Sequence, residues 1–208
     1  MLEAEVTSGN QTVDDLFARF GAHTFQQQPT PDNTPTLWLQ RDQLQEVLGH
    51  LRPRFPMLLD LFGVDERLRE NKPEAAADFS VVYHLLNLDD REELRLKVAV
   101  EASDPTVPTA TAVWPNANWY ERETWDMFGV EFSGHPNLRR ILLPPTWEGH
   151  ALRKDHPARA TEMEPFSLDE EKQAAEQEAL LFKPEEWGMA RATDCLLYTS
   201  PSPRDARK

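Results

Sequence analysis

Carboxylates that could do chemistry gather in the second half of the chain. Glu121, Glu123 and Asp126 lie close enough in sequence to share neighbouring turns of one helix. Such groups can act as general acids and bases or bind a metal ion. Carboxylates beside arginine are more often ion-paired structure, and no second cluster of ligands accompanies these three. We therefore expect a structural role, with Arg122 pairing with Asp126 one turn later.

Three histidines follow the carboxylates, at His135, His150 and His156, each in a different turn. A zinc site uses ligands at short fixed spacings, such as H-E-x-x-H or paired cysteines, and neither pattern occurs. The single cysteine, Cys195, cannot hold an iron–sulfur cluster, which takes about four thiolates. Ser133 lacks the G-x-S-x-G elbow of a hydrolase nucleophile. The sequence predicts no catalytic, cofactor-binding or metal-binding residue, and His135 is expected to be a hydrogen-bonded turn residue.

Basic side chains offer another chemical option. Arg139, Arg140, Arg153 and Lys154 could clamp a phosphate or a quinone headgroup. A nucleotide site would also need a glycine-rich loop, and neither G-x-G-x-x-G nor a P-loop is present. Guanidinium groups also suit desolvated pairing with carboxylates at a protein interface. We expect these groups to pair with acidic residues in this chain or in a partner.

All these residues belong to an aromatic-rich stretch, residues 114–157. Four of the six tryptophans fall in it, at Trp114, Trp119, Trp125 and Trp147, interleaved with opposed charges. Tryptophan and arginine are enriched at buried protein–protein contacts. We expect some of these tryptophans in the core and others on a surface that a partner covers.

A helix from residue 116 to 128 is expected to position the carboxylates. Asn116 is placed to cap its start, and Gly129 to end it in a left-handed conformation. One face is expected to pack inward: Ala117, Tyr120, Thr124, Met127 and Phe128. Another face carries Trp119, Glu123 and Asp126.

The remaining elements follow from hydrophobic periodicity. Helices are predicted at 12–20, capped by Thr12, and at 42–51. Strands are predicted at 36–40, at 57–62 as a buried strand, and at 79–88 and 93–101 as a hairpin turning at Asp89-Asp90. This order predicts an α+β fold with a mixed or antiparallel sheet, helices packed on one face, and then an extended C-terminal arm.

The chain is expected to divide into three regions. Residues 1–143 form the α+β domain, and residues 144–194 form an extended arm and linker, rich in proline and charge, with a helix from Ser167 to about Leu181. Residues 195–208 resemble a translated sequencing-adaptor tail and are set aside as non-native.

Composition excludes several classes of protein. The net charge of −14 argues against binding to nucleic acid or to anionic lipid. No apolar run approaches the roughly 20 residues that a membrane-spanning helix needs. The acidic start lacks the pattern of a signal or transit peptide, so a cytoplasmic location is expected.

A longer pattern points to a family. ERETWDMFGVEFSGHPNLRRILLP, followed by WEGHALRKDHP, resembles the signature of the C subunit of proton-pumping NADH-quinone oxidoreductase, respiratory complex I. The resemblance continues through ARATEMEPF to FKPEEWGMARATD and is similar to the bacterial form in which the C and D subunits are fused. Residues 16–102 match more loosely, and Ala151 and His156 depart from the usual Pro and Tyr. The resemblance implies a chain cut short before a D domain.

The resemblance also implies a role. Such a chain is a structural and assembly component of the peripheral arm, on the cytoplasmic side of the bacterial inner membrane, packed against the D, B and I subunits. It carries no redox centre, because the iron–sulfur clusters, FMN and quinone belong to other subunits of this translocase. The surface expected to contact partners comprises Trp119, Glu121, Arg122, Glu123, Trp125, Asp126, His135, Pro136, Arg139, Arg140, Arg153, Lys154 and Asp155.

Two alternatives stay open at this point. The equivalent subunit of a membrane-bound hydrogenase or formate hydrogenlyase shares the signature, although the match at FKPEEWGM and the fused-type junction favour the quinone enzyme. The second alternative is a stand-alone metal hydrolase that uses the carboxylates and histidines.

Overall fold

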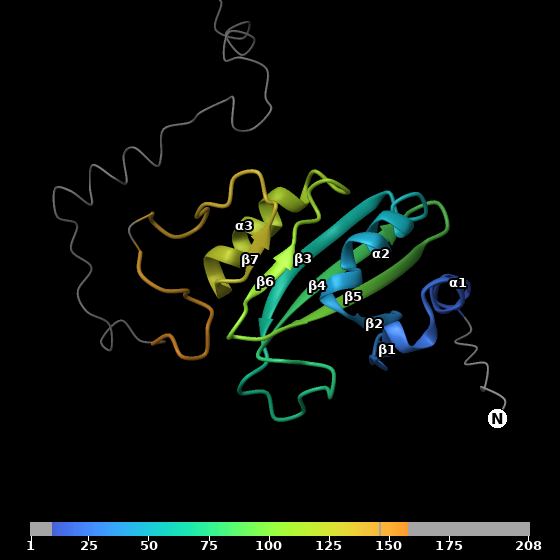
Figure 1. Ribbon diagram of the computed structural model, residues 1–208, viewed down its shortest axis with the longest axis horizontal. Helices are drawn as coiled ribbons and strands as arrows, with labels where there is room; N and C mark the ends of the chain where they lie inside the picture. Colours follow the sequence, from blue (N-terminus) through green and yellow to red (C-terminus); the bar gives the residue numbers. More distant parts are fainter. Residues whose placement is uncertain (1–9, 146, 158–208) are drawn as a thin grey trace, which may run out of the picture. The chain divides into compact units, whose positions relative to one another are not determined.

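The structure, a computed structural model, describes residues 10–145 and 147–157. Within that part a five-stranded sheet has the spatial order β1-β2-β5-β4-β3 (Figure 1). Its strands are β1 (Phe25–Gln27), β2 (Thr36–Leu39), β3 (Met57–Asp65), β4 (Phe79–Asn87) and β5 (Glu92–Val100). Neighbouring strands are antiparallel except β2 and β5, which run parallel. This mixed sheet with its helices confirms the predicted α+β class. The helix expected from Ser167 lies outside the described residues.

The β4–β5 hairpin forms where the sequence predicts it. The Asn87 side chain closes the turn by accepting hydrogen bonds from the backbone N–H groups of Asp89 and Asp90, at 3.0 and 3.3 Å. Arg91 takes a left-handed conformation, with φ of 54°. An asparagine that bonds to its own backbone two residues on is typical of such turns.

Helix α1 (Gln11–Phe20) begins one residue earlier than expected. Its cap is Asn10, whose side-chain oxygen accepts from the N–H groups of Thr12 and Val13 at 2.9 and 3.1 Å. The prediction of Thr12 as the cap is wrong, because Asn10 satisfies the first free N–H groups and Thr12 lies inside the first turn, buried. Gly21 ends the helix as predicted.

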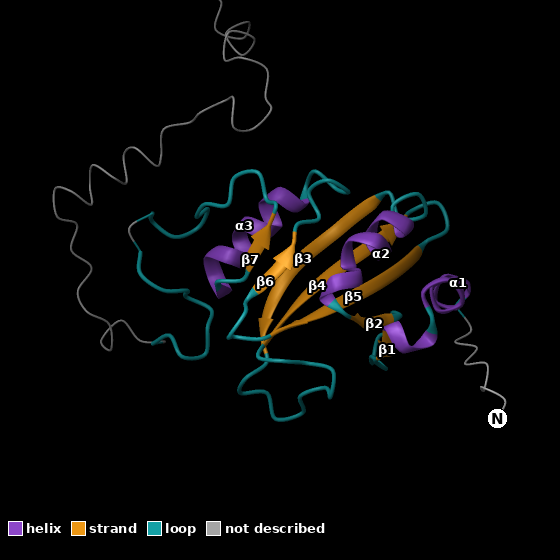
Figure 2. Cartoon of the chain, viewed as in Figure 1, coloured by secondary structure: helices purple, strands orange, loops and turns teal. Residues whose placement is uncertain are grey.

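Helix α2 (Leu44–Leu51) lies across one face of the sheet (Figure 2). Its apolar stripe packs on inward-facing strand residues, and each fully buried Leu or Val stabilises the fold by about 1.5–3 kcal/mol. The stripe consists of Leu44, Val47, Leu48 and Leu51, and the strand residues include Tyr83, Leu85, Leu96 and Val98. A short 3-10 turn, Arg41–Gln43, precedes α2 in place of the first helical residues that the sequence predicts.

Strand β3 is longer than predicted and forms an edge of the sheet. The expectation of a buried strand at 57–62 is wrong, because Met57 and Phe62 are 42% and 41% exposed. Their side chains lie on the face opposite α2, whereas Leu58 and Leu61 are buried in the core that α2 covers. The apolar run therefore alternates between two different environments.

Helix α3 (Ala117–Phe128) packs against β3 at Gly63. A Cβ atom at Gly63 would lie 2.7 Å from the ring of Phe128 and 3.0 Å from the methyl group of Thr124. The missing side chain therefore allows the helix to approach the strand closely. Two short strands flank α3 in the sequence, β6 (Thr106–Pro108) and β7 (Glu131–Ser133), and pair in parallel.

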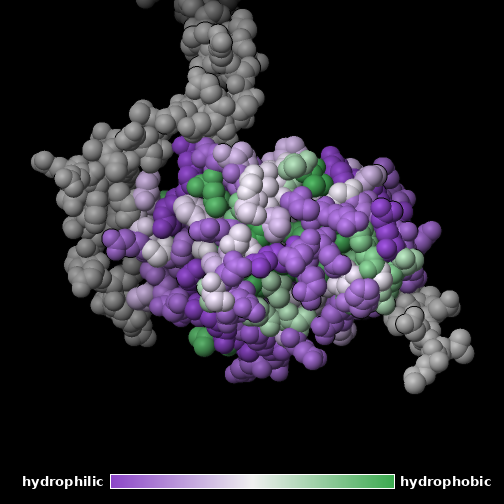
Figure 3. All heavy atoms as spheres, viewed as in Figure 1, coloured by the Kyte–Doolittle hydropathy of each residue, from purple (hydrophilic) through white to green (hydrophobic). Residues whose placement is uncertain are grey.

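The surface seen in Figure 3 is mostly polar. Hydrophilic residues cover most of the face seen in Figure 3, with small apolar patches between them. None of the helices in the described ranges has both the length and the apolar character needed to cross a membrane.

The contact at Gly63 yields a stability prediction. Gly63→Ala is expected to lower the free energy of unfolding by about 1–3 kcal/mol, because the added methyl group overpacks the Phe128 ring. Urea denaturation measures the change. The matched control is Gly49→Ala in α2, where nothing lies within 4 Å of the new Cβ; it should stabilise by about 0.5–1 kcal/mol. Equal effects at both positions would contradict the proposed packing.

Candidate functional site

The carboxyl end of α3 is closed by residues that follow it in the sequence. A helix leaves its last four carbonyl groups without partners inside the helix. Here each of those four carbonyls, from residues 125 to 128, accepts a hydrogen bond of 2.6 to 3.0 Å. The donors, in order, are the amide of Gly129, Nδ1 of His150, the amide of Leu152 and Nε of Arg153.

Gly129 makes this closure possible. Its φ of 73° and ψ of 26° are left-handed, as the sequence predicts. A Cβ atom here would collide with the Arg153 guanidinium and would lie 2.5 Å from the His150 ring. Any larger residue would therefore displace two of the donors that close the helix.

Asp126, in the last turn of α3, is the centre of the site. Its carboxylate is fully buried. Oδ2 accepts from the backbone N–H groups of Ile141, Leu142 and Leu143 at 2.8 to 3.0 Å, and Oδ1 accepts from Arg140 at 2.6 Å. Burial raises the pKa of Asp126, but the three amides and the guanidinium outweigh it and hold the pKa below its ordinary value.

Arg140 and Arg122 both lie near Asp126 but have different roles, which the sequence alone did not distinguish. The ion pair of Asp126 seen in the structure is formed with Arg140 rather than with Arg122, which helical spacing had suggested. Burial lowers the pKa of Arg122, although the Asp126 charge still raises it by a smaller amount. Arg122 turns instead toward the following loop and donates to the carbonyls of Arg139 and Arg140, both at 3.1 Å. Its guanidinium also lies over the ring of Trp119, 5.2 Å from the centroid. Both arginines therefore fasten the 139–143 loop to α3.

A second buried carboxylate holds the segment that follows. Asp65, at the end of β3, accepts from the Arg67 guanidinium at 2.6 Å and from the Lys154 amide at 2.8 Å. Arg67 also pairs with Asp155 at 2.9 Å. Burial raises the pKa of Asp65, but these donors outweigh it and lower the pKa to about 2. The first part of the predicted arm is thus hydrogen-bonded to the end of the edge strand β3.

The histidines His135 and His150 form hydrogen bonds within the chain that hold α3 and the residues that follow it. Nε2 of His135 donates to the carbonyl of Asn118 at 3.2 Å, and Nδ1 accepts from the amide of Asn137 at 3.0 Å. Both ring nitrogens are therefore used in the turn, which confirms the expected role of His135. Burial lowers the pKa of His135 and that of His150.

The predicted interface residues fall into three groups. Buried within this chain are Glu121, Arg122 and Asp126. Half-buried are Trp125, His135, Arg139, Arg140 and Arg153. Exposed are Trp119, Glu123, Pro136, Lys154 and Asp155. Any partner contact made by this segment therefore falls mainly on the exposed group, which the buried group holds in place.

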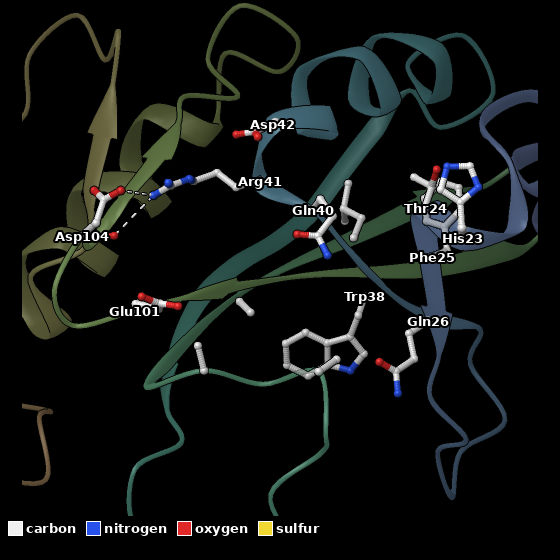
Figure 4. A pocket seen from close by; sticks show the side chains of 14 residues that line it. His23, Thr24, Phe25, Gln26, Trp38, Gln40, Arg41, Asp42, Glu101 and Asp104 are labelled. Atoms are coloured by element: carbon white, nitrogen blue, oxygen red, sulfur yellow. Dashed lines mark hydrogen bonds and ion pairs between the residues drawn. The ribbon is translucent and has the colours of Figure 1, made fainter.

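A pocket of the described part of the chain lies away from these residues. It has a volume of about 450 Å³, and the side chains around it include Trp38, Gln40 and Glu101 (Figure 4). Arg41 at its rim is paired with Asp104 at 2.7 Å. Within residues 10–145 and 147–157, no group of three His, Cys, Asp or Glu side chains is arranged to hold a metal ion.

Comparison with known proteins decides the family. Residues 37–162 match the family described as "Respiratory-chain NADH dehydrogenase, 30 Kd subunit". The chain belongs to this family. The resemblance drawn from the signature is therefore confirmed, and the residues that close α3 and bind Asp65 are part of the matched region.

Relatives of this chain support the same family assignment. The chain is 56% identical over 186 residues to the C/D subunit of the NADH-quinone oxidoreductase of Klebsiella pneumoniae, a match that covers 88% of this chain and 31% of the relative. The same subunit of Azotobacter vinelandii is 58% identical over 185 residues, again 31% of the relative. The chain thus spans about a third of the length of these relatives. Their names favour the quinone enzyme over the hydrogenase alternative.

Two solved structures share the fold. The trypsin-resistant fragment of Nqo5 is 30% identical, with a TM-score of 0.54, covering 61% of this chain and 98% of that one. A chain of an archaeal membrane-bound sulfane sulfur reductase has a TM-score of 0.60 over 78% of this chain and 97% of that one. At 21% identity, the second likeness shows the fold alone.

Sequence reasoning missed Asp65, Arg67 and Gly63. A polar pair directly after an apolar strand is a weak signal, since surface turns have the same composition. One partner of Asp65 lies 89 residues away at Lys154, a distance over which local patterns carry no information.

Removing the charge of Asp126 should show how much its hydrogen bonds and ion pair contribute to the free energy of unfolding. Asp126→Asn leaves the Arg140 guanidinium without its counter-charge, and we expect the free energy of unfolding to fall by about 3–5 kcal/mol. Chemical denaturation measures it. Glu123→Gln, an exposed site on the same helix, is the control and should change stability by less than about 0.5 kcal/mol. Similar losses in both variants would contradict the central role of Asp126.

The lowered pKa of Asp65 predicts a dependence on pH. A depressed carboxyl pKa stabilises the fold above the ordinary value of 3.8, and this contribution is lost as pH falls toward about 2. Asp65→Asn should therefore be less stable than the parent at neutral pH, and the gap should narrow as pH falls below 3.8. Urea denaturation at a series of pH values tests this. A gap that does not change with pH would refute the ion pair as its cause.

Proposed function

We propose that this chain is the structural, non-redox module of a fused C/D subunit in the peripheral arm of a proton-translocating NADH:quinone oxidoreductase. The supporting comparison is the identity of 56–58% to subunits of that name over most of this chain. The enzyme activity belongs to the whole complex, which transfers electrons from NADH to quinone. The module's own task is to hold neighbouring subunits in fixed geometry.

One structural observation carries the proposal. The buried acidic and basic side chains of the signature bond to backbone groups, to each other or to the Thr109 hydroxyl, above all at Asp126. Side chains that are hydrogen-bonded within the chain are held in one geometry, and together they form a rigid scaffold. That scaffold fixes α3 and leaves Trp119 49% exposed on its surface. A rigid, exposed tryptophan beside an arginine is the composition of an interface anchor.

The partners are proposed to be the D, B and I subunits of the complex. The contact surface consists of the exposed members of the signature: Trp119, Glu123, Pro136, Lys154 and Asp155. The half-buried members contribute their remaining accessible edges. Residues 144–194 lead toward the D domain that the fused relatives carry. The whole module lies on the cytoplasmic side of the bacterial inner membrane.

The redox groups belong elsewhere in this proposal. The iron–sulfur clusters are proposed to be bound by other parts of the complex, since a cluster takes about four thiolates and this chain has a single cysteine. FMN and quinone are likewise proposed to belong to other subunits. The metal hydrolase alternative finds no support in the geometry: the carboxylate of Asp126 and the ring of His135 are already occupied by internal hydrogen bonds.

An assembly experiment tests the proposal. Residues 1–194 replace the matching region of a fused C/D subunit in a bacterium that lacks its own copy. Trp119→Ala should weaken the interface by about 2 kcal/mol, as hot-spot tryptophans do, and so reduce the amount of assembled complex. Turnover of NADH with quinone, per assembled complex, should stay unchanged. Native gel electrophoresis and purified activity give the two readouts.

The control is Leu68→Ala, an apolar side chain 73% exposed on the β3–β4 connection. It should assemble like the parent, because it lies outside the signature. Normal assembly of Trp119→Ala with a reduced turnover would contradict the structural role. Circular dichroism of both isolated variants separates loss of the interface from loss of the fold.

A further inference from the structure

Another carboxylate of the signature is buried in a different way. Glu121 lies in the first half of α3 with a fully buried side chain. Its Oε2 accepts from the Thr109 hydroxyl and its Oε1 from the Ala110 amide, both at 2.5 Å. Both donors belong to the segment that joins β6 to α3. The carboxyl group therefore connects the helix to the preceding chain through two short hydrogen bonds.

No cation in the described part of the chain forms an ion pair with this carboxyl group. Among the described residues Glu121 forms no ion pair, whereas buried Asp126 pairs with Arg140 and buried Glu66 pairs with Arg69. An ionised carboxylate in the core without a counter-charge is strongly disfavoured, and such a group binds a proton instead.

The elements packed around Glu121 agree with its isolation. From β4 comes Tyr83, whose hydroxyl is buried with no hydrogen-bond partner in the described ranges. From α2 comes Gln45, a neutral side chain that donates to the carbonyl of Thr109. The next residue of α3, Arg122, directs its guanidinium at the 139–140 carbonyls, and His135 is directed at the carbonyl of Asn118.

We propose that Glu121 is a buried proton-binding site, which takes up and releases one proton while the chain stays folded. Burial raises the pKa of Glu121 to about 7, although the bonds from Thr109 and Ala110 lower it. Burial raises the pKa of Tyr83, and the negative charge of ionised Glu121 is a second, smaller cause. The inference does not depend on the assembly proposed above.

Protonation of Glu121 changes how stably α3 packs against the segment that precedes it. When Glu121 is neutral, burial of the carboxyl group carries no charge penalty, and when it is ionised the core contains an unpaired charge. A carboxyl pKa raised on folding stabilises the fold fully below the ordinary value of 4.5, and this contribution is lost as pH rises toward about 7.

Carbon-13 NMR of the glutamate carboxyl groups tests the site in the full 208-residue chain. One carboxyl should titrate near pH 7 in the parent and in the control Glu123→Gln. Thr109→Val removes a hydrogen bond that lowers the pKa, so the same signal should titrate at higher pH. If every glutamate of the parent titrates within about one unit of the ordinary value, or if Thr109→Val does not move the neutral signal, the proposal is overturned.

Stability provides an independent readout through Glu121→Gln, which keeps the shape of the side chain. Between pH 4.5 and 7 the unfolding equilibrium constant of the parent should rise relative to the variant by up to about tenfold per pH unit. A constant ratio over this range would also overturn the proposal. If the variant does not fold, the NMR titrations of the parent and of Thr109→Val still decide.

Discussion

The buried carboxylate of Asp126 is the interaction on which the rest of this structure depends. One oxygen receives a guanidinium, and the other receives three successive backbone N–H groups. A charge can be stable in the core only with such compensation. Because its donors come from the loop at 140–143, the carboxylate decides where the chain turns after α3. It also brings the loop close enough for residues 150–153 to reach the free carbonyls of the helix.

This arrangement explains why a long mixed pattern of aromatic and charged residues is needed to build one helix end. Gly63 lets α3 approach the sheet, Gly129 lets the donors approach α3, and Asp65 fastens the chain that supplies them. Each is a point of close contact between segments far apart in sequence. The result is a helix that is rigid at its carboxyl end and exposes Trp119. Such a surface suits the positioning role that we propose.

The buried carboxylates of the domain show two ways of placing acid in a core. Asp65, Glu66 and Asp126 have guanidinium partners, so each charge is balanced where it lies. Glu121 has only a hydroxyl and an amide, which are dipoles without net charge. The first arrangement keeps a permanent charge, and the second makes the charge depend on a proton. The same segment therefore combines a fixed fastening with one that responds to pH.

The sequence by itself determined the family, the α+β class, the β4–β5 hairpin and the end of α3 at Gly129. Those features follow from local periodicity, turn chemistry or a long signature. Tertiary structure alone decided that Arg140 rather than Arg122 pairs with Asp126, that β3 is an edge strand, and that Asp65 holds the chain at Lys154. The reason is physical: helical spacing favoured Arg122, and only the path of the loop after α3 placed the guanidinium of Arg140 at the carboxylate.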